Sequence, residues 1–253
     1  MVNLKQLLTE GVFDKGILKA VFMAGGPGSG KSYVAQELFG IPKKVNVSVS
    51  GLKSVNSDTE FEFLLKKYGF ETVGGGLDLD LWPDEVFQMV AVGDEESDTM
   101  TVRKKAKLLT KARKDQYMNG RLGMIIDGTG HDYAKLKKEK QQLEKLGYDC
   151  YMVFVNTSLK VAKERNQERA RSLPENILEK SWNDVQNNLG KFQGLFGRNM
   201  AVVDNSKFLK PKDAQKKFGM LTKKYVNKFL KEPIKNPKGK QWVKHNLILK
   251  GKK

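Results

Sequence analysis

The chain has 253 residues, of which 39% are apolar and 30% are charged, and its 46 basic and 29 acidic residues give a formal net charge of +17. This length and apolar content suit one large globular domain, or a domain with an appendage, and exclude a chain that is disordered throughout. The single cysteine, Cys150, excludes an intramolecular disulfide framework, and no apolar run approaches the roughly 18 residues of a membrane-spanning helix. We therefore expect a cytoplasmic protein without a secretory signal.

Five short apolar runs bounded by turn residues predict strands, at 19–24, 52–56, 122–127, 150–156 and 199–204. Helical patterns occupy the intervals between them, at 31–39, 58–68, 98–117, 131–146, 158–172 and 175–189, the last continuing toward residue 196. Strands that alternate with helices indicate parallel strands with helical crossovers, and so a sheet sandwiched between helices.

The connection from residue 58 to residue 121 is too long for one crossover helix. We expect an insertion at about 70–121 that covers the carboxyl edge of the sheet, where ligands of such folds bind. Residues 74–100 hold eight acids and no base, whereas 103–121 hold eight bases and one acid. We interpret this pattern as an acidic loop, 78–98, that leads into a basic helix.

A phosphate-binding motif follows the first predicted strand directly. The pattern G-x-x-x-x-G-K-[ST] is matched in full by Gly25, Gly26, Pro27, Gly28, Ser29, Gly30, Lys31 and Ser32. In such a loop the backbone N–H groups turn toward an anionic oxygen, and the next helix adds its positive end. We expect these residues and Tyr33 to hold ATP, with Lys31 on the β- and γ-phosphates and the Ser32 hydroxyl on Mg²⁺. A glycine-rich turn without a ligand is the alternative.

Two acidic residues follow predicted strands. Asp58 lies after the second strand, where a carboxylate can accept the proton of an attacking hydroxyl, but 57–60 also reads as a helix capping box. Asp127 ends the third strand, which is the expected place for a carboxylate that orients Mg²⁺, although it could also be a turn acid. We interpret His131 as a polar residue at the start of a helix.

Two arginines follow the fourth strand. Arg165 and Arg169 are four residues apart, so they share one face of a helix. Such a pair can close over ATP and neutralise charge on a transferred phosphoryl group. Because Glu164 and Glu168 are adjacent, a salt-bridged surface is the alternative.

The sequence resembles the zeta-toxin-like and polynucleotide-kinase-like P-loop kinases, a family that includes proteins encoded by bacteriophages. The resemblance spans about 19–206 and depends on five segments in the family's order: GGPGSGKS (25–32), NSD (56–58), DGTG (127–130), RNQER (165–169) and VVDNS (202–206). It implies a three-layer α/β P-loop kinase fold with a five-stranded parallel sheet, the use of ATP and Mg²⁺, and transfer of the γ-phosphate to a hydroxyl. It also implies Asp58 as the general base and Arg165 or Arg169 as the groups that stabilise the transition state. The insertion and the basic tail do not match family features, so the acceptor stays open.

The last 47 residues, 207–253, carry a net charge of +14, whereas residues 1–206 carry +3. A stripe of apolar residues at helical spacing predicts a helix at 211–231 that docks on the body, through Ala214, Phe218, Leu221, Tyr225 and Phe229. Beyond it, Trp242 could stack on a base. All sixteen cations of this region are lysines, which suit phosphates. We expect non-specific, salt-sensitive binding of nucleic acid, with a solvated tail or an anionic membrane or partner surface as alternatives.

We divide the chain into a lead-in, 1–18, a P-loop kinase core, 19–206, with a lid at about 160–195, and a Lys-rich helical extension and tail, 207–253. The function that we predict is a kinase acting on a hydroxyl of a nucleotide, a nucleotide-sugar or a nucleic acid end, in the host cytoplasm if a phage encodes it. A nucleic-acid-binding ATPase is the alternative. It would need a glutamate after the third-strand acid, and Gly128 stands there.

Overall fold

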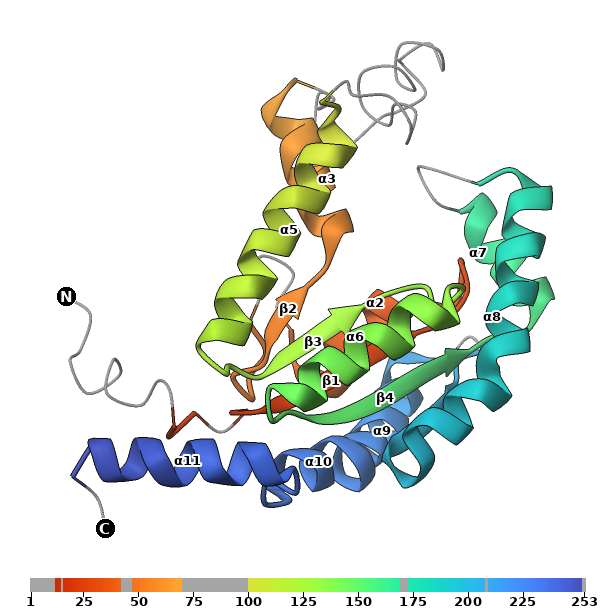
Figure 1. Cartoon of the computed structure of the whole chain (residues 1–253). Coiled ribbons are helices and arrows are strands. Elements are labelled where there is room, and N and C mark those ends of the chain that lie inside the picture. The colour runs from red at the N-terminus through yellow and green to blue at the C-terminus, as the bar shows by residue number, and fades with distance from the viewer. Residues whose placement is uncertain are drawn as a thin grey trace.

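The computed structural model describes residues 12–14, 16–41, 47–69, 100–168, 173–207 and 209–251. At its centre lies a five-stranded sheet in the order β2-β3-β1-β4-β5, in which every pair of neighbours is parallel (Figure 1). The strands are β1 (Lys19–Ala24), β2 (Lys53–Val55), β3 (Met124–Asp127), β4 (Asp149–Asn156) and β5 (Met200–Asp204). All five therefore end at one edge of the sheet, where the sequence motifs also lie.

Helices cover both faces of the sheet. They are α2 (Lys31–Phe39), α3 (Ser57–Lys67), α5 (Val102–Asn119), α6 (Tyr133–Lys145), α7 (Leu159–Gln167) and α8 (Glu175–Phe196), and the C-terminal region adds α9 (Pro211–Leu221), α10 (Asn227–Lys231) and α11 (Pro237–Leu249). The side chains of β1 alternate between two cores. Ala20, Phe22 and Ala24 pack with residues of α6 and α8, whereas Val21 and Met23 pack with residues of α2 and α9. A strand buried on both faces is typical of a parallel sheet between helical layers.

The predicted fold class is confirmed, and each predicted strand and helix has its counterpart. The end of the helix predicted at 158–172 lies partly outside the described residues, as does the acidic loop 78–98. β3 begins at Met124 rather than at residue 122, because Arg121 has a positive φ of 57° and Gly123 lies directly against the backbone of Gly16. The helix predicted at 175–189 continues unbroken to Phe196.

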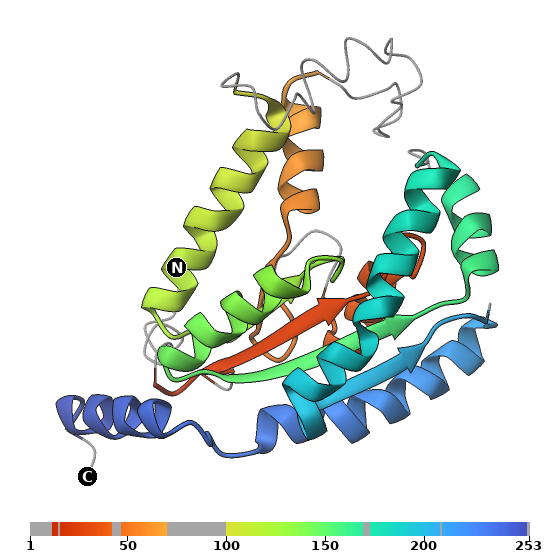
Figure 2. The ribbon, with the colours of Figure 1, turned by 45° about the vertical axis from the view of Figure 1, so that its right-hand side comes forward.

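The insertion contributes a helix that packs along α3, and the two rise from the sheet as a pair (Figure 1). Glu60 of α3 is buried and pairs with Arg113 of α5. The predicted capping box is not formed, because Asn56, and not Ser57, is the N-cap: its side chain accepts from the backbone N–H of Asp58 at 2.8 Å. A second pair, α7 and α8, rises on the other side of the strand ends, as the turned view in Figure 2 also shows.

The predicted helix at 211–231 docks on the body, on the face that α2 covers. Phe229 stacks on Tyr151 of β4 with ring centroids 4.3 Å apart. The helix contains a π-helical turn, η4 (Thr222–Val226), between α9 and α10. Because this turn holds one more residue than an α-helical turn, it changes the predicted stripe: Val226 is buried and Tyr225 is only partly covered.

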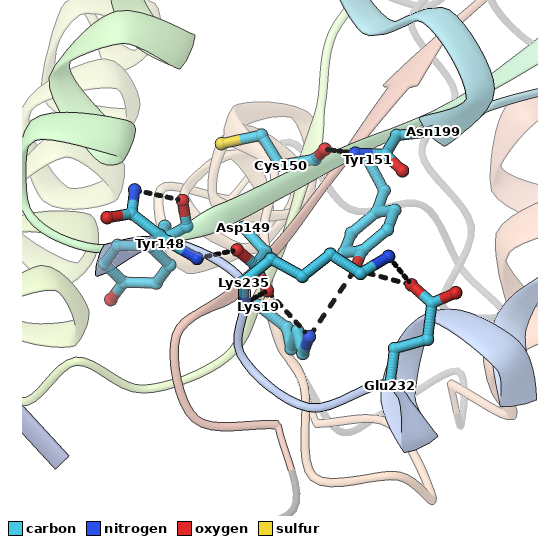
Figure 3. Close-up of polar contacts among 9 residues, drawn as sticks. Lys19, Tyr148, Asp149, Cys150, Tyr151, Asn199, Glu232 and Lys235 are labelled. Carbon is cyan, nitrogen blue, oxygen red and sulfur yellow. Dashed lines mark hydrogen bonds and ion pairs between the residues drawn. The ribbon is translucent and has the colours of Figure 1, made fainter. Parts of the chain in front are cut away.

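The chain beyond α10 is bound to the amino-terminal ends of β1 and β4 through Asp149 (Figure 3). Asp149 forms an ion pair with Lys19 at 3.0 Å, and the two side chains are 7% and 3% exposed. The same carboxylate accepts from the backbone N–H groups of Lys235 and Asn236, both at 2.9 Å. The buried charge of Asp149 thus has three donors, two of which come from the C-terminal region.

Helix α11 continues this docking. Gly239 lies so close to Gly147 that a Cβ atom would overlap the Gly147 carbonyl, and Trp242 packs against the core on the side of α6 and α8. Trp242 is therefore partly covered by the core, and stacking of its ring on a base stays a prediction. The C-terminal helix is part of the fold, at the opposite end of the strands from the P-loop.

Replacing Asp149 with alanine tests this docking. The substitution leaves the Lys19 ammonium and two backbone N–H groups without their acceptor, so we expect the free energy of unfolding to fall by about 3–5 kcal/mol. Urea unfolding followed by circular dichroism measures the change.

Glu144→Ala is the matched control, because Glu144 pairs with Lys140 one turn away on α6 in a partly exposed ion pair. Such helix pairs contribute about 0.5 kcal/mol or less. Equal losses in the two variants would show that Asp149 does not anchor the C-terminal region.

Candidate active site

The P-loop connects β1 to α2, and its glycines lie directly against later parts of the chain. Gly28 and Gly30 have positive φ angles of 72° and 76°, which glycine adopts without steric cost. A Cβ atom on Gly28 would overlap the backbone of Ala162 in α7, and one on Gly30 would lie 2.6 Å from Nδ2 of Asn205. Glycine is therefore required at both positions by conformation and by close approach.

Helix α2 begins at Lys31, directly after the loop, with Gly30 as its N-cap. Its positive end and first N–H groups thus face the loop, as phosphate binding requires. The Lys31 ammonium donates to the carbonyl of Gly25 at 2.9 Å, so it lies over the loop. Ser32 is exposed. The ring of Tyr33 packs edge-on against Phe218, 5.4 Å away, so its side chain points toward α9.

Asn56 ties together the two predicted carboxylates at the ends of β2 and β3. Its Nδ2 donates to Oδ2 of Asp127 at 3.0 Å, and its Oδ1 accepts from the backbone of Asp58. Burial raises the pKa of Asp127, while Lys31 lowers it and Asp58 raises it. The ammonium of Lys31 and the carboxylates of Asp58 and Asp127 are therefore within electrostatic reach of one another.

The residues fit a magnesium ion. Within the described ranges, two buried oxygen atoms of this site lack a hydrogen-bond partner, Oδ1 of Asp127 and Oγ of Ser29. Mg²⁺ prefers oxygen ligands and is usually held by one or two protein groups together with phosphate oxygens and water. The described residues contain no cluster of three or more His, Cys, Asp or Glu side chains that could hold a metal by themselves. Asp127 and Ser32 are the groups that would hold it.

Asp58 lies in the first turn of α3 with its side chain 68% exposed, so an acceptor can reach it. Its Oδ1 pairs with Arg103 of α5 at 2.7 Å. The guanidinium of Arg103 also lies over the ring of Phe61, 5.1 Å from its centroid. Arg103 was not singled out from the sequence, although a basic helix was predicted here.

Arg165 reaches the P-loop from α7. Its Nη1 donates to the carbonyl of Gly28 at 3.4 Å and to that of Ser29 at 3.5 Å. Burial lowers its pKa, against the opposing effect of Glu168 and Glu164. This contact places the Arg165 guanidinium against the outer, carbonyl side of the loop, and its role toward the phosphates stays a prediction. Arg169 lies outside the described residues.

Sequence reasoning missed several residues that surround the loop. Asn205 and Thr157 both donate to the carbonyl of Ser29, and Trp182 of α8 donates from Nε1 to the carbonyl of Thr157 at 2.9 Å. Thr157 and Asn205 directly follow β4 and β5, so the strand-end rule that found Asp58 and Asp127 would have found them too. His131 lies before α6, as expected, and bonds to Thr129, while Asp132 caps the helix.

Residues 21–191 match the model of a protein family described as an AAA domain. The chain belongs to this AAA domain family. The match includes four of the five segments on which the resemblance to P-loop kinases depends, and that resemblance is confirmed. Segment 202–206 and the C-terminal region lie beyond the matched residues. No curated protein matches the chain.

Solved structures with a similar fold have low sequence identity to this chain. One is the Pnkp1/Rnl/Hen1 RNA repair complex, with 18% identity, a TM-score of 0.46 and coverage of 70% of this chain but 46% of that one. Another is the PezAT chromosomal toxin–antitoxin system of Streptococcus pneumoniae, with 13% identity, a TM-score of 0.44 and coverage of 85% and 88%. A gluconokinase from Sinorhizobium meliloti 1021 has 13% identity, a TM-score of 0.41 and coverage of 84% and 98%.

None of the helices in the described ranges combines the length and the apolar content needed to cross a bilayer.

The raised pKa of Asp127 predicts a pH-dependent cost in stability. The folded protein retains the proton on Asp127 above the ordinary pKa of 3.8. The contribution of Asp127 to the free energy of unfolding is therefore complete below that value and is lost as the pH rises through the raised pKa. We expect the wild type to lose stability relative to Asp127→Asn as the pH rises above the ordinary pKa of 3.8. Urea unfolding of both proteins at several pH values measures the difference.

Asp204→Asn is the control, and its effect on stability should depend on pH in the opposite direction, because the pKa of Asp204 is lowered. Hydrogen bonds from Ser206 are the main cause of this lowered pKa. Its contribution is present above the ordinary pKa and is lost as the pH falls through the lowered one. A pH-independent difference for Asp127→Asn would show that this carboxylate does not bear a burial cost.

Proposed function

We propose that the chain is a kinase that transfers the γ-phosphate of ATP to a hydroxyl of a nucleotide, a nucleotide-sugar or a nucleic acid end. The observation that carries this proposal is the link through Asn56, which brings Asp58 and Asp127 together beside Lys31 and a complete P-loop. One carboxylate is exposed and the other is buried with an unpartnered oxygen. This division suits a proton acceptor and a metal ligand.

The roles follow from position. The loop N–H groups and Lys31 hold the β- and γ-phosphates. The oxygen of the acceptor hydroxyl bonds to the γ-phosphorus, and Asp58 accepts the proton of that hydroxyl. The bond between that phosphorus and the bridging oxygen breaks, and ADP leaves. Arg165, with Arg169 as the expected second arginine, neutralises charge on the transferred group. Mg²⁺ on Ser32 and Asp127 would supply further neutralisation of the phosphates. We assign α7 and α8, about 160–195, as the lid.

The ATPase alternative has less support. A water-activating residue would be expected beside Asp127, and Gly128 stands there. Asp58 follows β2, the strand next to β3, and pairs with Arg103 of α5 in the insertion. A base on this side of the site favours a bound acceptor over water.

The Lys-rich region is a proposed surface for nucleic acid. Lysines such as Lys216, Lys223 and Lys228 are exposed on α9, η4 and α10, while the apolar residues of these helices face the sheet. Because Asp149 anchors residues 235 and 236 at the amino ends of the strands, the lysines of α11 lie far from the P-loop. Binding at these α11 lysines would hold a polyanion without placing it in the active site.

Incubation with γ-labelled ATP and Mg²⁺ tests the kinase proposal, with 5′-hydroxyl DNA and RNA, nucleosides, nucleotides and UDP-sugars as acceptors. We expect the label to move to at least one of them and Lys31→Ala to abolish transfer. Asp58→Asn should retain ATP binding and lower the transfer rate by roughly 10²–10⁴-fold, because it removes the proton acceptor.

Asp213→Asn is the control, since Asp213 is also an acid in the first turn of a helix but lies on α9. It should transfer at the wild-type rate. Label found only in free phosphate, at a rate raised by DNA, would support the ATPase alternative. Undiminished transfer by Asp58→Asn would leave this residue with a role only at the start of α3.

Neutralising three exposed lysines tests the proposed surface for nucleic acid. The triple variant Lys216→Gln, Lys223→Gln, Lys228→Gln should bind single-stranded DNA more weakly and with a smaller salt dependence, because fewer counterions are released. Fluorescence anisotropy at several salt concentrations measures both effects. The control replaces three exposed lysines of α6, Lys135, Lys137 and Lys138, and equal losses in both variants would contradict a localised surface.

A further inference from the structure

The carbonyl of Ser29, in the middle of the P-loop, accepts hydrogen bonds from three separate elements. Nδ2 of Asn205 donates to it at 2.8 Å, Oγ1 of Thr157 at 3.3 Å and Nη1 of Arg165 at 3.5 Å. Asn205 and Thr157 are 5% and 1% exposed. A single loop carbonyl thus accepts hydrogen bonds from the residue after β5, from the residue after β4 and from α7.

The direction of this carbonyl determines the direction of the next N–H group. In a trans peptide the C=O and the N–H point to opposite sides of the chain. Because the Ser29 carbonyl is held toward Asn205 and Thr157, the N–H of Gly30 is held toward the other side of the loop. In a loop of this pattern, that is the side on which N–H groups surround a phosphate.

Asn205 is best placed of the three to fix this peptide. Its bond to Ser29 is the shortest, and its own backbone N–H donates to the carbonyl of Asn156 at 2.8 Å, which attaches it to the end of the sheet. Its amide occupies the space that a side chain on Gly30 would fill. Thr157, by contrast, also directs its hydroxyl to the carbonyl of Asn156 at 2.8 Å.

We propose that Asn205 is a positioning residue for polyphosphate binding: by holding the Ser29 carbonyl outward, it keeps the Gly30 N–H turned into the loop. This inference rests on the proposed binding of ATP by the P-loop. Asn205 acts through the peptide that faces the phosphates and not through the base or the acceptor. Its contribution is therefore the same for any ligand that places a di- or triphosphate in the loop.

The test compares two substitutions of an amide side chain, Asn205→Leu and Asn236→Leu. Asn236 matches Asn205 chemically, because its Nδ2 also donates to backbone carbonyls, those of Glu144 and Tyr148, at the far end of the sheet. Calorimetry measures binding of Mg-ADP and of Mg-tripolyphosphate, which has no base. We expect Asn205→Leu to weaken both ligands roughly 10-fold or more, and Asn236→Leu to leave both unchanged. Asn205→Ser, a smaller change, should give the same pattern should the leucine variant fail to fold.

The outcomes separate this inference from the proposed function. If the wild type binds neither ligand, both the proposed function and this inference fail. If the wild type binds and Asn205→Leu binds equally well, only the inference fails. A loss for Mg-ADP without a loss for Mg-tripolyphosphate would mean that Asn205 acts on the base, and an equal loss in Asn236→Leu would mean general destabilisation. Either result would overturn the proposal.

Discussion

The turn between β1 and α2 has glycine at the two positions where its neighbours come closest, Gly28 and Gly30, and the site depends on this close packing. Gly28 touches the backbone of α7, and Gly30 touches the amide of Asn205. A loop that must present N–H groups inward has to turn its carbonyls outward, and those carbonyls need donors if they are buried. Helix α7 and the ends of β4 and β5 supply them, so the loop, α7 and the β4–β5 half of the sheet form one hydrogen-bonded unit.

The other half of the sheet positions the two carboxylates of the candidate site. β2 and β3 lie on the opposite side of β1 from β4 and β5, and they bring Asn56, Asp58 and Asp127 to the same edge. The amide of Asn56 bonds to both: its Nδ2 donates to the Asp127 carboxylate, and its Oδ1 accepts from the backbone N–H of Asp58. The insertion then adds Arg103 beside Asp58. The strands that carry the donors to the P-loop and those that precede the two carboxylates thus lie on different sides of the first strand.

The sequence predicted the fold well because the parallel sheet is buried on both faces, so its strands stand out as short apolar runs. The P-loop and the acids after β2 and β3 were found in the same way, since strand ends are visible in the sequence. Arg103 and Asn205 were not assigned roles. The pairing of Arg103 with Asp58 depends on how α5 lies along α3, and the bond from Asn205 to Ser29 joins positions 176 residues apart. The π-helical turn that buries Val226 in place of Tyr225 interrupts a stripe that was regular in the sequence.

The anchoring of the C-terminal region on Asp149 also concerns the order in which the chain is synthesised. Lys19 and Asp149 can meet once β1 and β4 have left the ribosome, but the two backbone donors on Asp149 are 86 and 87 residues further along. Domains fold from the N-terminus during synthesis as far as their contacts allow. A nascent chain that ends before residue 235 has its sheet residues present, yet Asp149 still lacks two of its donors. The final stability of the P-loop domain is therefore acquired only after residues 235 and 236 have been synthesised.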